Sequence, residues 1–177
     1  MTDSSLRVLL RAVAAAERPV VLIDGGAGSG KSTLAAELAE QWPTSATPQV
    51  VCTDQFCPGW DGLAVAAARV PQVIATAEFV EWDWIAEAPG EPRHLDPRRP
   101  LIIEGCGAIT PASRELATLA IWMDAPEELR RERALARDGE LFAPHWQQWA
   151  EQEQRHWNAG RPWELADLVI DVAADAV

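Results

Sequence analysis

The sequence has no tyrosine, three cysteines, and only one lysine among its 15 basic residues. It also lacks a run approaching the roughly 20 apolar residues that cross a bilayer, so we expect no membrane partner. Three cysteines are too few for a disulfide framework, and the spacing of Cys52, Cys57 and Cys106 does not fit a zinc knuckle. These scarcities exclude a membrane-spanning protein and a disulfide-stapled one, and they argue against a zinc protein.

Positive charge is scarce as well. Fifteen basic residues face 27 acidic ones, which gives a formal net charge of −12. Such a chain is a poor candidate for nonspecific binding to nucleic acid or anionic lipid. The hydrophobic fraction of 48% and the 177-residue length indicate a globular protein, and we expect one domain over residues 1–177.

The apolar N-terminal segment weakly imitates a signal peptide. Arg7 and Arg11 interrupt it, and the spacing of its apolar residues is that of an amphipathic surface helix. We therefore expect a cytoplasmic protein.

Five short apolar runs indicate buried parallel strands, because Val, Ile and Leu follow one another without alternation. They are residues 20–24, 50–54, 101–105, 119–124 and 168–172. Helical patterns lie between them, at 31–42, 63–77 with Pro71 as an expected break, 126–137 and 145–157. The Pro- and Gly-rich segment 87–100 reads as an excursion before the third strand. Strands that alternate with helices predict a three-layer α/β domain.

The strongest motif is "GGAGSGKST" at 25–33, which satisfies G-x-x-x-x-G-K-[ST] between a strand and a helix. Backbone N–H groups of such a loop surround phosphate oxygens at a helix N-terminus. Lys31 is the only lysine, as expected where a compact point charge is required. We expect Lys31 to reach the β- and γ-phosphates of a nucleotide and Ser32 to ligate Mg²⁺. The predicted nucleotide-binding residues are Gly25, Gly26, Ala27, Gly28, Ser29, Gly30, Lys31, Ser32 and Thr33.

Two acids follow apolar runs at strand ends, where ligands bind in open α/β sheets. Asp54 ends the second strand, and Glu104 ends the third. A kinase needs a carboxylate that accepts the proton of the acceptor hydroxyl, which is the role we expect for Asp54. A solvated turn acid is the alternative for Asp54, and Glu104 is the expected Mg²⁺ ligand beside Ser32.

The segment 124–139 is rich in arginine. On a helix, Arg130, Arg133 and Arg137 share one face. Arginines on a mobile lid can clamp phosphates and neutralise charge during transfer. The alternative is a solvated helix held by Glu–Arg pairs such as Glu127–Arg131.

Together these pieces resemble the uridine kinase-like branch of P-loop nucleoside kinases, including its short bacterial members. The matching segments are "IDGGAGSGKST", "DQF" from Asp54, "IIEG" at Glu104, and D-x5-R-x2-R-x3-R-D from Asp124 to Asp138, within residues 20 to about 140. The resemblance implies a P-loop NTPase fold with sheet order 2-3-1-4-5 and ATP with Mg²⁺. It also implies a catalytic base at Asp54, a Mg²⁺-associated acid at Glu104, and a lid helix that carries Arg130, Arg133 and Arg137, the first of them toward the nucleotide.

Two features depart from that family. Cys57 stands where the family often has a tyrosine after D-x-F, and the "PGWDGL" loop is typical of the short bacterial members rather than of authentic uridine kinases. The resemblance therefore implies phosphotransfer and leaves the acceptor open.

The segment from Asp54 to Pro92 is expected to form the acceptor pocket. It contains seven acids and a single base, Arg69, which favours a neutral polyol or an amine-bearing small molecule over a phosphorylated one. The candidate acceptor-binding residues are Trp60, Asp61, Asp83 and Trp84, although each tryptophan could equally be part of the core.

Two other functions remain open. A nucleotide monophosphate kinase would use Arg69, Arg93 or Arg114 for the acceptor's phosphate. A regulatory P-loop ATPase would release ADP without a phosphorylated small product, and Asp54 would then be dispensable.

Overall fold

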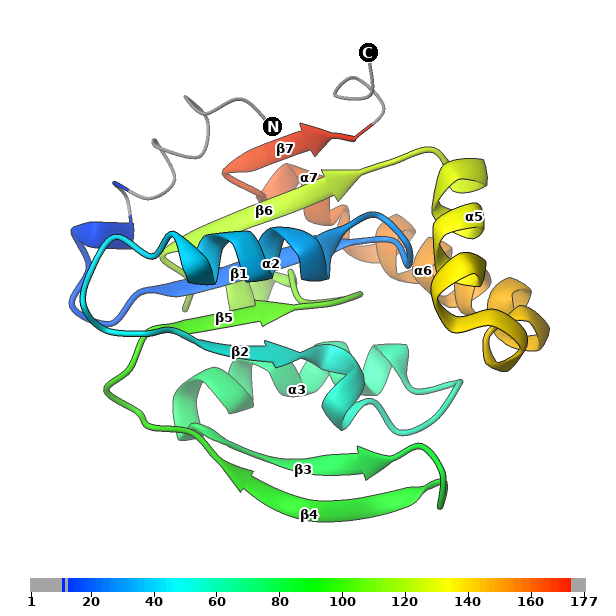
Figure 1. The fold of residues 1–177 in the computed structure, drawn as a ribbon, viewed down its shortest axis with the longest axis horizontal. Helices are drawn as coiled ribbons and strands as arrows, with labels where there is room; N and C mark the ends of the chain where they lie inside the picture. Colours follow the sequence, from blue (N-terminus) through cyan, green and yellow to red (C-terminus); the bar gives the residue numbers. More distant parts are fainter. Residues whose placement is uncertain (1–10, 12, 173–177) are drawn as a thin grey trace.

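The computed structural model describes residue 11 and residues 13–172 (Figure 1). Most of the predicted N-terminal amphipathic helix lies outside these residues. Of its apolar positions only Val13 is described, and its side chain is buried. None of the helices in the described part of the chain is long and apolar enough to span a bilayer.

A five-stranded parallel sheet forms the centre of the molecule, in the order β2-β5-β1-β6-β7. The strands are β1 (Val20–Gly25), β2 (Gln49–Cys52), β5 (Leu101–Glu104), β6 (Leu119–Asp124) and β7 (Leu168–Asp171). Counted along the parallel strands alone, this order is 2-3-1-4-5, so the predicted topology is confirmed.

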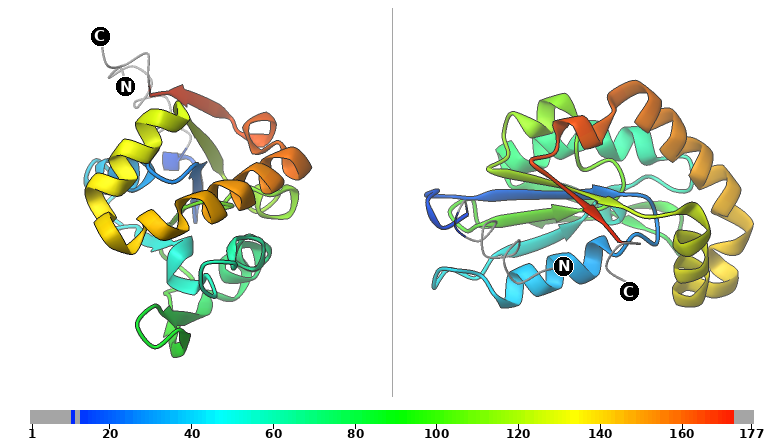
Figure 2. Two further views of the ribbon diagram at one scale, coloured as in Figure 1. Left: turned by 90° about the vertical axis from the view of Figure 1, so that its right-hand side faces the viewer. Right: turned by 90° about the horizontal axis from the view of Figure 1, so that it is seen from above.

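Helices cover both faces of this sheet, which gives the predicted three layers (Figure 2). They are α2 (Lys31–Glu40), α3 (Leu63–Thr76), α4 (Pro111–Arg114), α5 (Glu127–Asp138), α6 (Trp146–Gly160) and α7 (Pro162–Leu165). Short 3-10 turns are η1 (Thr53–Phe56), η2 (Gly139–Leu141) and η3 (Ala143–His145).

The apolar strand residues divide between two cores. Val21 and Ile23 of β1 pack toward Leu34 and Leu38 of α2. The neighbouring Leu22 packs on the opposite face, in the cluster that contains residues of α3 and α6. Successive residues of a strand point to opposite faces, so a strand covered on both sides must be apolar throughout.

A two-stranded hairpin lies beside the main sheet and was not predicted. It pairs β3 (Glu78–Asp83) with β4 (Ala88–His94), antiparallel (Figure 1). Its residues are mostly half-buried or exposed, and Pro89 and Pro92 lie inside β4. The hairpin therefore lacks the apolar run that identifies a buried strand, and proline argues against a strand except at an edge. Segment 87–100 does lie outside the main sheet and before β5, as interpreted, but its first half forms the strand β4, which was not predicted.

The expected break at Pro71 was also wrong, because α3 continues through that residue to Thr76. Proline removes one helical hydrogen bond. Val70, Val73 and Ile74 are all buried on the same helix, and their burial outweighs that loss.

Candidate active site

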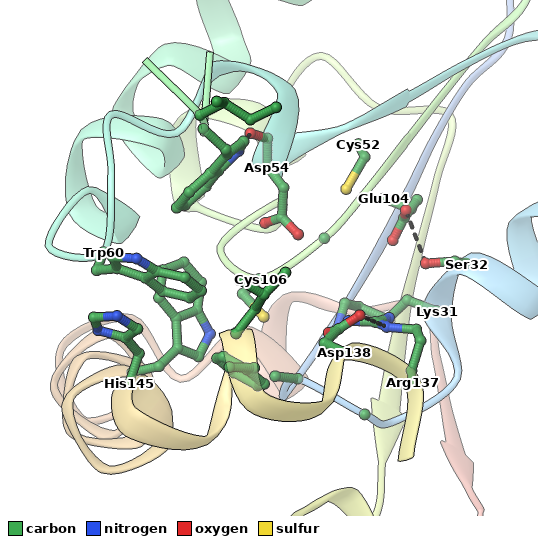
Figure 3. A pocket seen from close by; sticks show the side chains of 18 of the residues that line it. Lys31, Ser32, Cys52, Asp54, Trp60, Glu104, Cys106, Arg137, Asp138 and His145 are labelled. Atoms are coloured by element: carbon green, nitrogen blue, oxygen red, sulfur yellow. Dashed lines mark hydrogen bonds and ion pairs between the residues drawn. The ribbon is translucent and has the colours of Figure 1, made fainter. Parts of the chain in front are cut away.

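A cavity of about 840 Å³ opens at the carboxyl ends of the central strands. Figure 3 shows its two ends: Lys31, Ser32, Glu104 and Arg137 lie at one, and Trp60 and His145 at the other. The carboxylate of Asp54 points into the space between them. A second cavity of about 650 Å³ adjoins the first one at Gly28, Lys31, Ser32 and Arg137. Predicted phosphate-binding and acceptor-binding residues therefore share one continuous region.

The loop "GGAGSGKST" joins β1 to α2, as its motif predicts. Gly28 and Gly30 have φ angles of 81° and 98°, in the left-handed region that favours glycine. A Cβ on Gly28 would also collide with the backbone carbonyl of Arg130. Gly28, Ser29, Gly30, Lys31, Ser32 and Thr33 line the second cavity, and Ala27 lines the first. Gly25 and Gly26 belong to the loop but line neither cavity.

Lys31 is buried, with 7% of its surface exposed, and its Nζ donates a hydrogen bond of 2.8 Å to the carbonyl of Gly26. Burial acts to lower the pKa of this ammonium group, but the surrounding acidic groups, first Cys106 and then Glu104, Glu153 and Asp24, raise it overall. The group therefore stays positively charged near neutral pH, as a phosphate-binding lysine must.

Ser32 and Glu104 meet beside the loop. The Ser32 hydroxyl donates a hydrogen bond of 3.0 Å to Glu104 Oε1. Two hard oxygen ligands suit Mg²⁺, which keeps several waters and binds substrate phosphates as well. No cluster of three acidic, histidine or cysteine side chains offers a fuller cation site among the described residues. The donor set thus fits a magnesium ion shared with a nucleotide and not one caged by the protein.

Asp54 lies in the turn η1, directly after β2 and not within the strand as its sequence suggested. Asp54 is exposed toward the cavity, and the protein that surrounds its carboxyl group removes part of its hydration. This loss of hydration raises its pKa, and Glu104 adds to the rise, while Lys31 and Arg137 oppose it. The carboxylate is therefore a stronger base than a solvated aspartate. The indole of Trp84 donates a hydrogen bond of 3.0 Å to the Asp54 carbonyl and fixes the turn.

Aromatic rings form the far end of the cavity. Trp60 stacks on His145 with ring centroids 4.0 Å apart and 6° between the ring planes. Trp84 meets the edge of Trp60 at 5.0 Å, and Phe142 lies 5.7 Å from Trp60. Trp60 and Trp84 both line the cavity, as expected of acceptor-binding residues.

The two predicted acceptor-binding acids do not line the cavity. Asp61 accepts a hydrogen bond of 2.7 Å from Gln148 of α6. Asp83 caps the hairpin turn by accepting the backbone N–H groups of Ile85 and Ala86, which lower its pKa. Both carboxylates have structural partners, and Glu87 lines the cavity in their place.

The three lid arginines do not share one environment. Arg133 and Arg137 line the second cavity beside the phosphate loop. Arg130 is buried, and its Nη1 lies 3.0 Å from Glu153 Oε2 and 3.3 Å from the Ala27 carbonyl. The structure therefore places Arg130 behind the loop, away from both cavities, and differs here from the predicted nucleotide contact.

Glu153 is the main residue that sequence analysis missed. Its Oε1 accepts a hydrogen bond of 2.6 Å from the Ala27 N–H, so Glu153 and Arg130 bind the backbone N–H and C=O of the same loop residue. The spacing in the sequence could have identified this residue. Glu153 follows Trp146 by seven residues and Trp149 by four, which places a carboxylate on the apolar face of α6.

The arginines needed by a nucleotide monophosphate kinase are engaged elsewhere. Arg69 donates to the carbonyl of Phe56, Arg93 pairs with Glu81 on the hairpin, and Arg114 binds Asp167. None of the three lines the cavity.

No protein-family model and no curated protein sequence matches the chain. A possible uridine kinase from Bacillus stearothermophilus has a TM-score of 0.65 and 17% identity, over 95% of this chain and 98% of that one. A candidate fructose transport system kinase from Silicibacter sp. TM1040 has a TM-score of 0.63 and 21% identity, over 96% and 99%. Shikimate kinase from Bacteroides thetaiotaomicron has a TM-score of 0.51 and 12% identity, over 86% of each chain.

The chain therefore has the P-loop kinase fold. The resemblance to the uridine kinase-like branch is confirmed at the level of the fold, and the comparisons extend over nearly the whole chain.

The buried ion pair behind the loop gives a stability prediction. Arg130→Met leaves the Glu153 carboxylate buried without its cation, so we expect the free energy of unfolding to fall by about 3–5 kcal/mol. Arg93→Met removes the exposed partner of Glu81 and should cost less than about 1 kcal/mol. Urea denaturation of the two variants and the parent protein measures both effects. Equal losses in the two variants would contradict the role assigned to the buried pair.

Proposed function

We propose that the protein is an ATP-dependent phosphotransferase that moves the γ-phosphate onto a hydroxyl of a small molecule. We also propose that residues 1–177 act as one P-loop kinase-like domain. The observation that carries the proposal is that Asp54 and Lys31 line one cavity, with space beyond Asp54 for an acceptor. A carboxylate at that position is what a phosphotransferase needs to accept the proton of an acceptor hydroxyl.

In the proposed reaction, Asp54 accepts the proton of the acceptor hydroxyl as its oxygen bonds to the γ-phosphorus. The bond between the γ-phosphorus and the oxygen that bridges to the β-phosphate breaks, and ADP and a phosphate ester result. Lys31 and the backbone N–H groups of the loop bind the phosphates, and Arg133 and Arg137 balance the charge that shifts to the leaving oxygen.

Mg²⁺, held by Ser32 and Glu104, would neutralise charge on the β- and γ-phosphates. Cys52 and Cys106 also line the cavity. Burial raises the pKa of both thiols well above the usual value, so they are neutral near neutral pH and are not the nucleophile.

The acceptor class follows from the charges along the cavity. The chain has no described arginine or lysine at the aromatic end, which favours a nucleoside-like, polyhydroxylated or amine-bearing alcohol over a phosphorylated acceptor. The positions of Arg69, Arg93 and Arg114 weigh against the nucleotide monophosphate kinase alternative.

Replacement of the proposed base tests the reaction. Asp54→Asn keeps the shape but cannot take a proton, so we expect phosphorylated product to fall by about 10²–10⁴-fold while the Kd for ATP changes little. Asp83→Asn is the matched control, because Asp83 lies outside the cavity, and it should leave turnover nearly unchanged.

Product is measured by mass spectrometry against a panel of small alcohols, and ATP binding is measured by calorimetry. Normal turnover in Asp54→Asn would remove Asp54 as the base. ADP release without any phosphorylated small product would instead indicate the regulatory ATPase.

The raised pKa of Asp54 predicts the acid side of the pH profile. A base acts only when deprotonated, so turnover is retained above the pKa of Asp54 and lost as the pH falls through it. Because that pKa is raised, the midpoint of the loss in kcat should lie above the value of about 3.9 for a solvated aspartate. A midpoint at or below that value, measured while circular dichroism shows a folded protein, would contradict the assignment.

A further inference from the structure

We propose that the acceptor is an alcohol with a flat apolar ring and a protonated amine, and that Glu87 binds the amine. This inference rests on the proposed phosphotransfer, because it places the reacting hydroxyl beside Asp54. It goes further by assigning the aromatic end of the cavity to a cationic ligand class.

The cavity is strongly asymmetric in charge. Its two strongly basic side chains, Lys31 and Arg137, lie at the phosphate end. Arg137 is moreover held by Asp138 through hydrogen bonds of 2.8 and 2.6 Å. The lining acids are Asp54, Glu87, Glu104 and Asp138.

Two of these acids, Glu87 and Asp54, form no ion pair within the described residues, although the charges of Lys31 and Arg137 reach Asp54. Glu104 shares a hydrogen bond with Ser32 beside the loop, and Asp138 pairs with Arg137. Within the described residues, Glu87 forms no ion pair, although it lines the cavity at the hairpin turn. A ligand cation near the hairpin turn would gain the Glu87 carboxylate, whereas a ligand anion there would meet that carboxylate and no lining guanidinium.

The walls of this end are aromatic and apolar. Trp60, Trp84, Phe142, His145 and Trp149 line it, and Ile85 and Leu141 lie at the margin with 98% and 80% of their surfaces exposed. Aromatic faces attract both flat apolar rings and cations, and a Trp gives the strongest cation–π contact. The two largely exposed apolar side chains are positioned to cover an apolar ligand body.

The aromatic end is built as a fixed wall. Gln152 of α6 donates a hydrogen bond of 2.6 Å to the Trp60 carbonyl, and Gln148 of α6 donates one of 2.7 Å to Asp61. The His145 ring lies against Trp60 and shares a hydrogen bond with Gln148 through Nδ1. Residues of α6 and of the adjoining turn η3 therefore hold Trp60 in place, which lowers the entropic cost of ligand binding.

A nucleoside fits these walls less well. A nucleobase and a ribose present several hydrogen-bonding groups, and a site that reads them needs matching donors and acceptors. When ionised, Glu87 and Asp54 only accept hydrogen bonds, so they can bind ribose hydroxyls but not the carbonyl oxygens of a nucleobase. Carboxylates and aromatic faces together suit an ammonium group on a flat ring.

Three benzyl alcohols that differ only in their para substituent test this class: para-(aminomethyl)benzyl alcohol, para-(hydroxymethyl)benzyl alcohol and para-(hydroxymethyl)benzoate. Their binding is measured by calorimetry with Mg²⁺ and a non-hydrolysable ATP analogue present, and uridine is measured alongside. We expect the amine to bind about tenfold more tightly than the neutral diol, and the carboxylate to bind most weakly. Tightest binding of uridine or of the carboxylate would overturn the proposal.

A paired substitution tests the part played by Glu87. Glu87→Gln should reduce the preference for the amine over the neutral diol about threefold, and Glu91→Gln should leave it unchanged. Both residues are exposed on the same hairpin, but Glu91 does not line the cavity. An unchanged preference in Glu87→Gln would overturn the assignment.

The same compounds are then incubated with Mg²⁺ and ATP, and phosphorylated product is measured by mass spectrometry. Binding in the expected order without any phosphate ester would contradict the phosphotransfer and leave the acceptor class supported. Phosphorylation with the carboxylate or uridine as the best substrate would support phosphotransfer and overturn the acceptor class.

Discussion

One buried ammonium group, Lys31 Nζ, lies within electrostatic reach of four carboxylates from four different elements. They are Asp24 of β1, Asp54 of η1, Glu104 of β5 and Glu153 of α6. A buried charge is costly unless it is compensated, so Lys31 requires these acids, and they come together only when the strands stand in the observed order. Sheet, loop and covering helix are therefore linked through one positive charge.

The same arrangement holds the phosphate loop in shape. Asp24 accepts the backbone N–H groups of Gly25, Gly107 and Ile109, which ties the loop after β5 to the end of β1. Glu153 and Arg130 bind the backbone N–H and C=O of Ala27 from behind the loop. Backbone groups that are already fixed bind phosphate at a smaller entropic cost, because little further ordering is needed.

The excess of carboxylates also indicates which positive charges ATP binding would require. ATP brings negative charge into a region with more acids than bases, so binding should depend on Mg²⁺ and on the arginines at the second cavity. In the proposed reaction, the acidity that would make ATP binding depend on a cation would also disfavour anionic acceptors. The selectivity for the nucleotide and that for the acceptor would then both follow from one charge distribution.

The sequence predicted the parts of the fold that depend on local signals. Apolar runs identified the five strands, and the spacing of the phosphate loop identified the place of Lys31 and Ser32. The sheet order was expected from the resemblance to the uridine kinase-like branch and not from these local signals. Helical spacing alone predicts the same environment for Arg130 and Arg133. Arg130 is buried because it pairs with Glu153 of α6, and the position of α6 cannot be predicted from that spacing. The sequence did not predict the hairpin, because its strands lack a continuous apolar run and one of them contains proline. The position of Glu87 at the hairpin turn therefore could not be predicted either.

The most direct test of the central claim is a crystal structure with Mg²⁺ and a non-hydrolysable ATP analogue. The account predicts that the γ-phosphate lies between Lys31 and the cavity that Asp54 faces, with the ion beside Ser32 and Glu104. It also predicts that Asp54 can reach an oxygen placed in line with the γ-phosphorus. A nucleotide whose γ-phosphate points away from that cavity, out of reach of Asp54, would contradict the account.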